Sequence, residues 1–416
     1  MRLSEKKKCS IAIGPIHPAL KEPIQIEVKI EGEKVTDVDF ALGHVHRGIE
    51  WIGLRRNPLQ ILYLAERVCG ICNISHPLAF CTAIENAANI KVPERAEYLR
   101  VIYAELERIH SHLLFLGVAA HELGFDSILH YTWLVREKVL DIIEYLTGNR
   151  ITKAVLMIGG IRRDITKEQI PKIKEMLKYY EKIYKKLCDI FLDDPTIKLR
   201  TRDIGVLTKE QALKLCIVGP TARASGVKKD IRQDFPYAAY ADLKIEAITP
   251  ATLLNEIRGD VFDRVIVRLL EVKQSMDIIK RCLKEMPEGP IMYEPVLQKL
   301  LVELKQVSNE GIALVEAPRG ELIHYIRMKN SEAPVVWKIR APTYANMHAI
   351  PAILKDCQLA DVPIVVASID PCISCANRAI VADKNNIVLN QEKLHELSVK
   401  KTLALTKDKV KGEGND

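Results

Sequence analysis

Two Cys-x-x-Cys pairs are the residues of this sequence best suited to chemistry. Cys69 and Cys72 lie in the segment ERVCGIC, and Cys372 and Cys375 lie in DPCISC. Thiolates are soft ligands, and four of them meeting at one point would suit zinc, iron or nickel. The pairs are about 300 residues apart (72 to 372). The fold would therefore have to bring opposite ends of the chain together around a single site.

The plainest alternative is a structural zinc site with four thiolate ligands. Zinc ribbons usually place their two pairs roughly 15–20 residues apart and close a small local fold. Here a large core lies between the pairs, and such a core needs no zinc to fold. The spacing alone leaves a structural zinc and a catalytic metal both open. The six other cysteines are scattered singly and are expected to be reduced apolar residues: Cys9, Cys81, Cys188, Cys216, Cys282 and Cys357.

A third motif precedes the first cysteine pair and makes the pattern more specific. The segment RGIE (47–50) is followed by fifteen residues and then by ERVCGIC. This arrangement resembles the N-terminal nickel signature of [NiFe] hydrogenase large subunits, and DPCISC resembles their C-terminal signature. GPIHP, ERIHSHLL and GNRITKAVLMIGGIRRDI resemble the membrane-bound, energy-converting group, which includes formate hydrogenlyase and is related to the 49 kDa subunit of respiratory complex I. The resemblance covers essentially the whole chain.

The resemblance implies a nickel–iron centre held by the four cysteines. All four would bind nickel, Cys69 and Cys372 terminally, while Cys72 and Cys375 would bridge to an iron that carries CO and cyanide ligands. The activity implied is heterolytic splitting of H2, an oxidoreductase reaction. The proton would go first to Cys372 or to the guanidine group of Arg319, in the segment EAPRG.

Four further residues match the family's site. Pro318, beside Arg319, matches the segment that lies over the iron, and His76 matches a histidine that contacts a cysteine sulfur. Glu22 matches the family's proton-gating glutamate, because a buried site needs a relay for its protons. Glu50 matches a ligand of a second metal, magnesium or iron, in many hydrogenases.

Two positions depart from the usual signatures. Many hydrogenases bind the second metal with a histidine three residues after the last cysteine, and Arg378 stands there in this chain. This difference puts the magnesium in doubt. Ile369 stands where an aromatic residue is usual. Three histidines match polar positions of the complex I relatives and are expected to be structural: His17, His110 and His112.

The elements that must position these residues are mostly helical. The alternating segments IQIEVKI and VTDVDFAL, joined by EGEK, predict an N-terminal β-hairpin. Helical periodicity begins near Pro93, and a second helix is expected over 127–146, with Gly148 just past its end. A long helix is expected from Thr249 to about Met286, and others over 294–307 and 347–359. Short strands are expected in ALVEAPRGELIHYIRM and PVVWKIR.

The predicted fold is α+β, a large helical bundle with small β pieces near both ends. We divide the chain into a β-rich segment (1–60), a helical hydrogenase core (61–378) and a C-terminal extension (379–416). The family pattern suggests that a maturation protease removes this extension after Arg378. Residues 407–416 are polar and are expected to be disordered.

The expected partners follow from the composition and from the family. The net charge is +7, and no basic stretch is interleaved with aromatic residues, so we expect no nucleic-acid partner. No apolar run reaches the roughly 20 residues that cross a bilayer. The chain is therefore expected to be peripheral, at the cytoplasmic face of the membrane, held by ion-translocating membrane subunits. Without further clustered cysteines, electrons would pass to a small subunit with a 4Fe-4S cluster and on to or from ferredoxin.

The sequence allows three other interpretations. A complex I-like subunit that binds quinone would lack the four cysteines, all of which are present here. A related enzyme could keep a cysteine-bound metal centre and reduce sulfur compounds instead. A scaffold with a structural zinc would leave the RGIE spacing, Glu22 and Arg319 as coincidences.

Overall fold

Helices form the body of this molecule, and small antiparallel sheets lie around them. The computed structural model describes residues 8–17, 20, 22–376, 378, 381–383, 386–389 and 391–410. Within these ranges the sheets have two or three strands each. The mainly helical α+β fold predicted from the sequence is confirmed.

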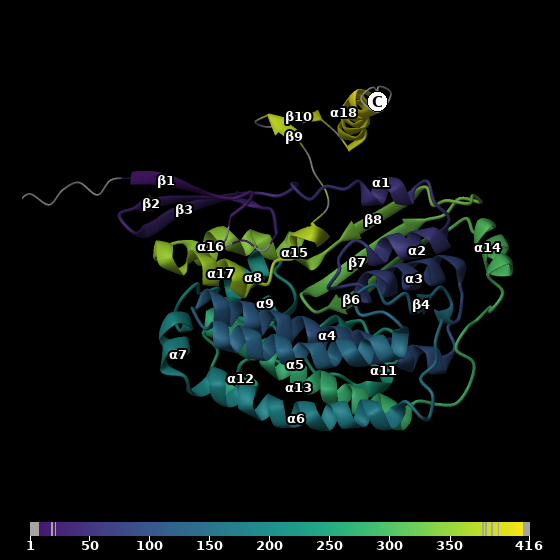
Figure 1. The fold of residues 1–416 in the computed structure, drawn as a ribbon, viewed down its shortest axis with the longest axis horizontal. Helices are drawn as coiled ribbons and strands as arrows, with labels where there is room; N and C mark the ends of the chain where they lie inside the picture. The colour runs from purple at the N-terminus through teal and green to yellow at the C-terminus, as the bar shows by residue number, and fades with distance from the viewer. Residues whose placement is uncertain are drawn as a thin grey trace, which may run out of the picture.

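Four long helices make the lower half of the molecule in Figure 1. They are α4 (Glu94–Glu122), α5 (Asp126–Thr147), α6 (Ile170–Asp193) and α13 (Val261–Glu285). Helix α4 packs against both α5 and α13, and its middle is buried on every side. The prediction for α5 is confirmed to within one residue at each end, because Gly148 adopts the left-handed conformation (φ 83°) that ends it.

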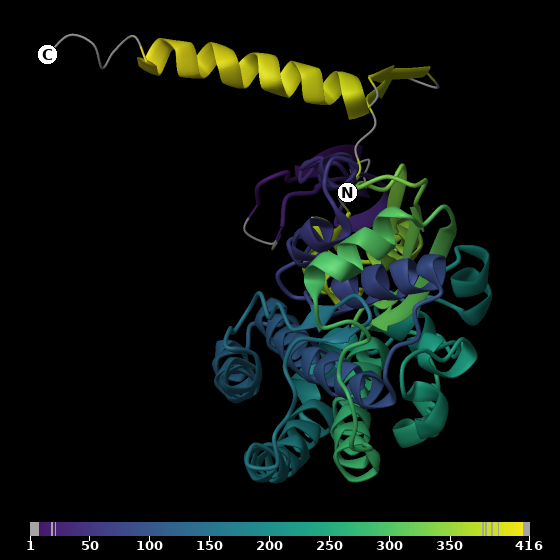
Figure 2. The same cartoon turned by 90° about the vertical axis from the view of Figure 1, so that its right-hand side faces the viewer.

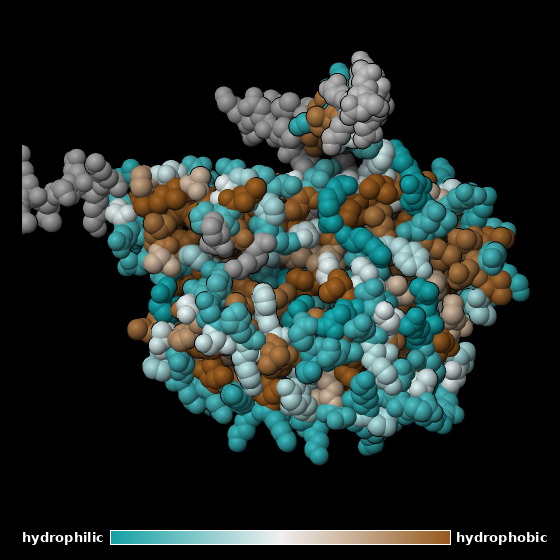
Figure 3. All heavy atoms as spheres, in the orientation of Figure 1, coloured by the Kyte–Doolittle hydropathy of each residue, from teal (hydrophilic) through white to brown (hydrophobic). Residues whose placement is uncertain are grey.

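The predicted N-terminal hairpin is confirmed and has a third strand. Strands β2 (Gln25–Glu31) and β3 (Lys34–Ala41) pair as expected, and β1 (Lys8–Ile13) pairs with β2 on its other edge. Alternate residues of β2 are buried, as its sequence pattern requires. The face seen in Figure 3 is mixed in polarity, and apolar side chains gather over this sheet.

A second three-stranded sheet supports the region of the cysteines. Strands β6 (Glu310–Ala317) and β7 (Gly320–Arg327) form a hairpin with a two-residue turn at Pro318 and Arg319, and β8 (Val336–Arg340) pairs with β7. Helix α3 (Ser75–Ala88) packs against β6 and β7. The strands predicted in these segments are confirmed.

The helix expected from Thr249 to Met286 is wrong in its first turns. A short α12 (Ala251–Leu254) ends at Asn255, which has φ 56°. The long helix begins only at Val261, where the Asp260 side chain accepts a hydrogen bond from the backbone N–H of Asp263. The helix expected over 347–359 is also wrong in extent, because η1 (Met347–Ala349) and α16 (Ile350–Leu354) cover only its first part, directly after the separate α15 (Pro342–Asn346).

The remaining helices and strands are short and connect these parts. They are α1 (Ile49–Gly53), α2 (Pro58–Glu66), β4 (Leu156–Met157), β5 (Gly160–Ile161), α7 (Pro195–Thr201), α8 (Lys209–Lys214), α9 (Gly219–Ala224), α10 (Ile231–Asp234), α11 (Tyr240–Leu243), α14 (Leu297–Lys305), η2 (Leu359–Asp361), α17 (Val362–Ser368) and η3 (Ile373–Cys375).

The chain leaves the body directly after the second cysteine pair. Strands β9 (Val381–Asp383) and β10 (Asn386–Leu389) lead into α18 (Gln391–Val410), which runs clear of the body in Figure 2. The His395 ring lies 3.7 Å from the Trp51 ring, centroid to centroid. The disorder expected over 407–416 is wrong for residues 407–410, which belong to α18, and residues 411–416 lie outside the described part. No helix of the described residues is long and apolar enough to cross a membrane.

Candidate metal centre

The two cysteine pairs meet in the interior, as the sequence predicts. The Sγ atom of Cys372 lies 3.2 Å from that of Cys69 and 3.0 Å from that of Cys375. The sulfur atoms of these three residues all lie within 4.8 Å of one another. Cys72 belongs to the same buried group, and its sulfur lies 3.5 Å from Arg319 Nη1. All four thiols are free of disulfides.

The donor set fits a soft metal ion. Hydrogen bonds from the neighbouring thiols, that of Cys372 first, lower the pKa of Cys69 well below its usual range, whereas the pKa of each of the other three thiols is raised, so that Cys69 ionises first. A thiolate is the form of cysteine that binds metals. Four sulfur ligands with almost no exposure to water suit nickel, iron or zinc better than the hard cations magnesium or calcium.

Helix α4 holds the first cysteine loop. The Glu107 carboxylate accepts hydrogen bonds from the backbone N–H groups of Ile74 (2.5 Å) and Ser75 (3.0 Å), at the start of α3. His110 Nε2 lies 3.3 Å from the carbonyl oxygen of Ile71. The loop between Cys69 and α3 is therefore anchored on a helix that follows it closely in sequence.

Glu22 holds the second cysteine loop. Its carboxylate accepts hydrogen bonds from the backbone N–H groups of Ile373 (2.5 Å) and Ser374 (3.2 Å), and from the Ser374 hydroxyl. Burial, and then the negative charge of Cys69, raise the pKa of Glu22 above its usual value. The structure thus brings Glu22 to the loop that carries Cys372, about 350 residues away in sequence.

Arg47 joins the two loops to each other. Its guanidinium donates to the carbonyl oxygens of Arg67 (2.8 Å), Val68 (2.7 Å) and Ser374 (2.9 Å). The sequence showed Arg47 only as part of the RGIE spacing and gave no hint of these contacts. The first residue of RGIE therefore links both cysteine loops.

Arg319 projects into the site from the turn between β6 and β7, where Pro318 is buried beside it. Its Nη2 donates to Asp370 Oδ1 (2.8 Å), its Nε to the Asp370 carbonyl (2.9 Å), and its Nη1 to Ser111 Oγ (3.2 Å). Burial opposes its charge, but Asp370 and the thiols hold the pKa of Arg319 well above its usual value. Arg319 is therefore a cation at neutral pH. Asp370 was missed as a site residue, although it directly precedes Pro371 and Cys372 in the motif.

Two glycines allow the turn at Pro318 and Arg319 to pack closely against the start of α9. A Cβ atom on Gly219 would lie 2.3 Å from the Cα of Gly320, and one on Gly320 would lie 2.7 Å from the Cα of Gly219. Both residues also have positive φ angles (68° and 123°). Asn346 donates to the Arg319 carbonyl from the other side (3.2 Å). The backbone of Arg319 is thus fixed from two directions.

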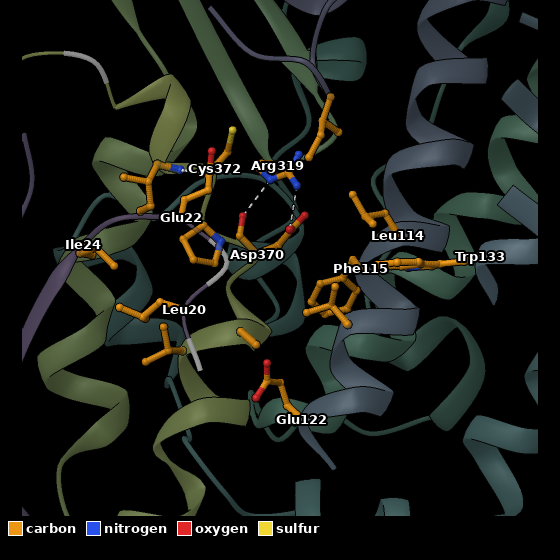
Figure 4. Close-up of a pocket in the computed structure, with 16 residues that line it drawn as sticks. Leu20, Glu22, Ile24, Leu114, Phe115, Glu122, Trp133, Arg319, Asp370 and Cys372 are labelled. Atoms are coloured by element: carbon orange, nitrogen blue, oxygen red, sulfur yellow. Dashed lines mark hydrogen bonds and ion pairs between the residues drawn. The ribbon is translucent and has the colours of Figure 1, made fainter. Parts of the chain in front are cut away.

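A cavity opens beside the centre, as Figure 4 shows. Its volume is about 320 Å³. Glu22, Glu122, Arg319, Asp370 and Cys372 form its polar part, and the apolar lining includes Leu20, Ile24, Leu114, Phe115 and Trp133. The cavity gives molecules larger than H2 room beside Cys372.

His76 contacts the cysteine of the opposite loop. Its Nε2 lies 3.4 Å from Cys375 Sγ, and its Nδ1 lies 3.1 Å from His324 Nε2. Burial lowers the pKa of His76 to about 4, so the ring is neutral. The sequence gives no sign of a role for His324, because a histidine in an alternating strand belongs to no motif.

Glu50 is buried, and protein groups surround its carboxylate. Oε1 accepts from Arg378 Nη2 (2.8 Å) and from the backbone N–H of Ile339 (2.9 Å), and Oε2 accepts from Lys338 Nζ (3.2 Å). These two cations neutralise the carboxylate, so the residues present do not fit a magnesium ion unless Arg378 moves away. Magnesium binding at Glu50 stays a prediction.

A group of buried charges, two of them on α4, was not expected from the sequence. We call it the ion cluster; its members are Glu105, Arg108, Arg223, Asp230, Arg232, Glu271 and Glu316.

Contacts within the ion cluster are short. Arg223 pairs with Glu271 (2.7 Å) and Glu316 (2.9 Å), and Arg232 pairs with Glu105 (3.2 Å). The cluster has three cations and four carboxyl groups, and burial raises the pKa of Glu316 to about 7. A proton on Glu316 would balance the charges.

The three histidines expected to be structural contact protein groups. His112 Nε2 lies 2.9 Å from Glu271 Oε2, in the ion cluster, and His110 supports the first cysteine loop. The carbonyl of His17 accepts from the backbone N–H of Leu20 (2.9 Å). Their structural role stays a prediction.

Family models match most of the chain. Residues 122–378 match the model of the 49 Kd subunit of the respiratory-chain NADH dehydrogenase, and residues 47–121 match that of nickel-dependent hydrogenases. The two matches adjoin, and together they run from RGIE to Arg378.

Individual proteins are similar over nearly their full length. The chain is 47% identical to the membrane-bound hydrogenase subunit alpha of Pyrococcus furiosus, over 97% of this chain and 95% of that protein. It is 39% identical to the carbon monoxide-induced hydrogenase of Rhodospirillum rubrum, over 89% and 99%. A chain in the structure of the membrane-bound sulfane sulfur reductase, an archaeal respiratory membrane complex, superposes with a TM-score of 0.82 at 28% identity, covering 90% of this chain and all of that one.

Proposed function

The chain belongs to the family of [NiFe] hydrogenase large subunits related to the 49 kDa subunit of complex I, and on this premise we propose that it is the catalytic subunit of a membrane-associated hydrogenase. It would interconvert H2 with protons and electrons. The observation that carries the proposal is the meeting of four buried cysteines under the Arg319 guanidinium. A quinone-binding relative without thiols would not need this arrangement.

The thiols would hold the metals. By the family resemblance, Cys69 and Cys372 would hold nickel, and Cys72 and Cys375 would hold both nickel and an iron that carries CO and cyanide. When bound, the nickel–iron pair would supply the redox centre at which H2 is split heterolytically.

The surrounding side chains would orient substrate and move the proton. Because Arg319 is held as a cation by Asp370, we assign the first proton to the Cys372 thiolate and give Arg319 and Pro318 the role of closing the site. Glu22 lines the same cavity as Cys372, and its raised pKa means that it takes up a proton more readily than a solvated glutamate does. Glu22 would therefore take the proton onward.

Partner subunits would transfer the electrons and hold the chain at the membrane. The cysteines outside the two pairs are not clustered, so a small subunit with a 4Fe-4S cluster would carry electrons to or from ferredoxin. Membrane subunits would hold the chain at the cytoplasmic face and couple its reaction to ion translocation. A maturation protease would cut after Arg378, where the chain leaves the body.

The experiment that tests the proposal is an infrared spectrum of the purified native complex, with nickel and zinc analysis. We expect absorption bands of metal-bound CO and cyanide, and one nickel per chain. Zinc in place of nickel, without such bands, in material made with its maturation proteins, would overturn the proposal.

Reduction of sulfur compounds is a second candidate function. It is favoured by the likeness to the sulfane sulfur reductase and by the cavity of about 320 Å³, which is larger than H2 requires. Supplying the complex with a reduced electron donor decides between the two. A hydrogenase forms H2 from protons alone, whereas a sulfur reductase forms sulfide and needs the polysulfide substrate.

A further inference from the structure

A line of hydrogen-bonding rings runs from the sheet to the metal centre. Trp337 Nε1 lies 3.3 Å from His324 Nδ1, His324 Nε2 lies 3.1 Å from His76 Nδ1, and His76 Nε2 lies 3.4 Å from Cys375 Sγ. The rings come from β8, β7 and α3, and all three are buried. Nothing in the sequence motifs points to His324 or Trp337.

The chemistry of the first ring sets the direction of the whole line. The indole N–H can only donate, so His324 Nδ1 must accept. A histidine ring always keeps at least one N–H, so a ring whose Nδ1 accepts a hydrogen bond must have its proton on Nε2. His324 must then have its proton on Nε2 and donate to His76 Nδ1. His76 in turn must have its proton on Nε2, which faces Cys375.

The far end of the line agrees with this direction. A cysteine that binds a metal is a thiolate and can only accept a hydrogen bond. Both ends therefore require the same tautomer of each histidine, because reversing the line would set two N–H groups against each other at Trp337 and two lone pairs against each other at Cys375.

We propose that Trp337 and His324 are positioning residues that fix the tautomer of His76, so that its Nε2–H donates permanently to the sulfur of Cys375. Partners of this kind tune metal ligands by fixing the orientation and electron density of the ligand. The assignment of Cys375 as a metal ligand rests on the proposed function, but the tautomers follow from the protein contacts alone.

The position of Trp337 is itself tightly constrained. A Cβ atom on Gly53 would lie 2.2 Å from Cε3 of its ring, so only glycine fits there. The Phe80 ring packs on it edge to face, with centroids 5.7 Å apart. The backbone N–H of Ile339, two residues along β8, is bonded to Glu50. The RGIE helix α1 thus fixes the strand and the ring that begin the line.

The tautomers can be read directly by 15N NMR of the complex with [15N]histidine in this chain. Signals of His76 and His324 are identified by their loss in His76→Gln and His324→Gln. We expect both rings to be protonated at Nε2 only, and Trp337→Phe to release His324 into a mixture of tautomers. Protonation of His324 at Nδ1 in the wild-type chain would overturn the proposal, whether or not metal is bound.

The infrared bands of metal-bound CO and cyanide measure how the hydrogen bond from His76 to Cys375 affects the metal centre. His324→Leu should shift these bands and lower H2 turnover roughly 10- to 100-fold, with nickel content unchanged. His324→Gln should restore both, because its amide can accept from Trp337 and donate to His76. Trp337→Phe should shift the bands, whereas the matched change Trp51→Phe should not, because the Trp51 ring packs against His395 and Arg55 and makes no hydrogen bond to the line.

The outcomes separate this inference from the proposed function. Unshifted bands in nickel-loaded His324→Leu and Trp337→Phe would refute the role of the line while leaving the hydrogenase assignment intact. If wild-type material has no such bands, the proposed function fails, and the 15N spectra alone decide the tautomers.

Discussion

Two buried polar regions lie against different faces of helix α4, and they differ in the kinds of side chain that form them. The metal centre consists of thiols and a few groups that hydrogen-bond to backbone, and several of its contacts join the two ends of the chain. The ion cluster consists of paired arginines and carboxylates from the middle of the chain. Arg108, a member of the cluster, donates to the Glu316 carbonyl at the end of β6 (2.5 Å), two residues before Pro318.

This difference in composition predicts that substitutions in the two regions have different effects. The thiols can be changed without leaving an unpaired charge, since serine is almost the same size and neutral. If the ion cluster loses one member, the charges of its partners are left unpaired in a low-dielectric interior, which is strongly destabilising. We therefore expect substitutions in the centre to remove activity and substitutions in the cluster to remove stability.

The largest effect on activity should come from Cys72→Ser or Cys375→Ser. Each removes a ligand assigned to both metals, so we expect no metal incorporation and no H2 turnover, with circular dichroism showing unchanged helical content. Cys9→Ser, at an exposed cysteine, is the control and should keep full activity. Hydrogen turnover by either ligand variant would contradict the bridging assignment.

The largest effect on stability should come from Arg223→Met. This change leaves Glu271, Glu316 and Asp230 without their shared cation and should lower the free energy of unfolding by about 3–5 kcal/mol. Chemical denaturation measures it. Arg258→Met, which removes an exposed guanidinium, should leave the denaturation curve where it is. Equal curves for the two variants would show that the cluster adds no stability.

Acid should weaken the cluster through Glu271. Burial alone would raise its pKa, but Arg223 and His112 lower the pKa of Glu271 well below the ordinary value of 4.5. A carboxylate with a lowered pKa in the folded state stabilises the fold above its unfolded pKa and loses that contribution as the pH falls through the folded value.

The test is Glu271→Gln, measured by denaturation from pH 7 to pH 3. The variant should be less stable than wild type by about 1.5–3 kcal/mol at neutral pH. The gap should persist down to about pH 4.5 and close below it. A gap that widens in acid would mean that Glu271 is protonated in the folded protein.

The smallest effect should come from Arg47→Lys, at the link between the cysteine loops. A lysine can reach one of the three carbonyls at a time, and Arg47 is partly exposed, so we expect a loss of only about 1 kcal/mol. Nickel should nevertheless leave the variant faster under a chelator, because the loops are no longer joined. Arg56→Lys is the control. Unchanged nickel retention would show that the loops hold together without Arg47.

Residues of the centre could be predicted where their spacing forms a motif. The four cysteines, Glu22 and Arg319 were named from the sequence, and the structure brings them together. Arg47, His324 and Trp337 could not be assigned roles, because their contacts depend on where β7, β8 and the loops pack, and no local pattern encodes that.

The ion cluster could not be predicted from the sequence either, for a related reason. Its charges lie between positions 105 and 316, on segments that read as ordinary amphipathic helices and strands. Charged residues are usually solvated, so a sequence gives no reason to bury them. The same holds for the break after α12: Asn255 and Asp260 end one helix and begin another, whereas apolar periodicity alone runs through both.

Cys69 and Cys372 are 303 positions apart in the sequence, and this separation sets a delay between the synthesis of the two cysteine pairs. A ribosome adding 5–20 residues per second needs roughly 15–60 s to make that stretch. During this time the nascent chain carries the first two thiols without their partners, open to oxidation and to stray zinc. The order of synthesis therefore requires that metal loading wait for the last part of the chain, and that the early thiols be shielded until it arrives.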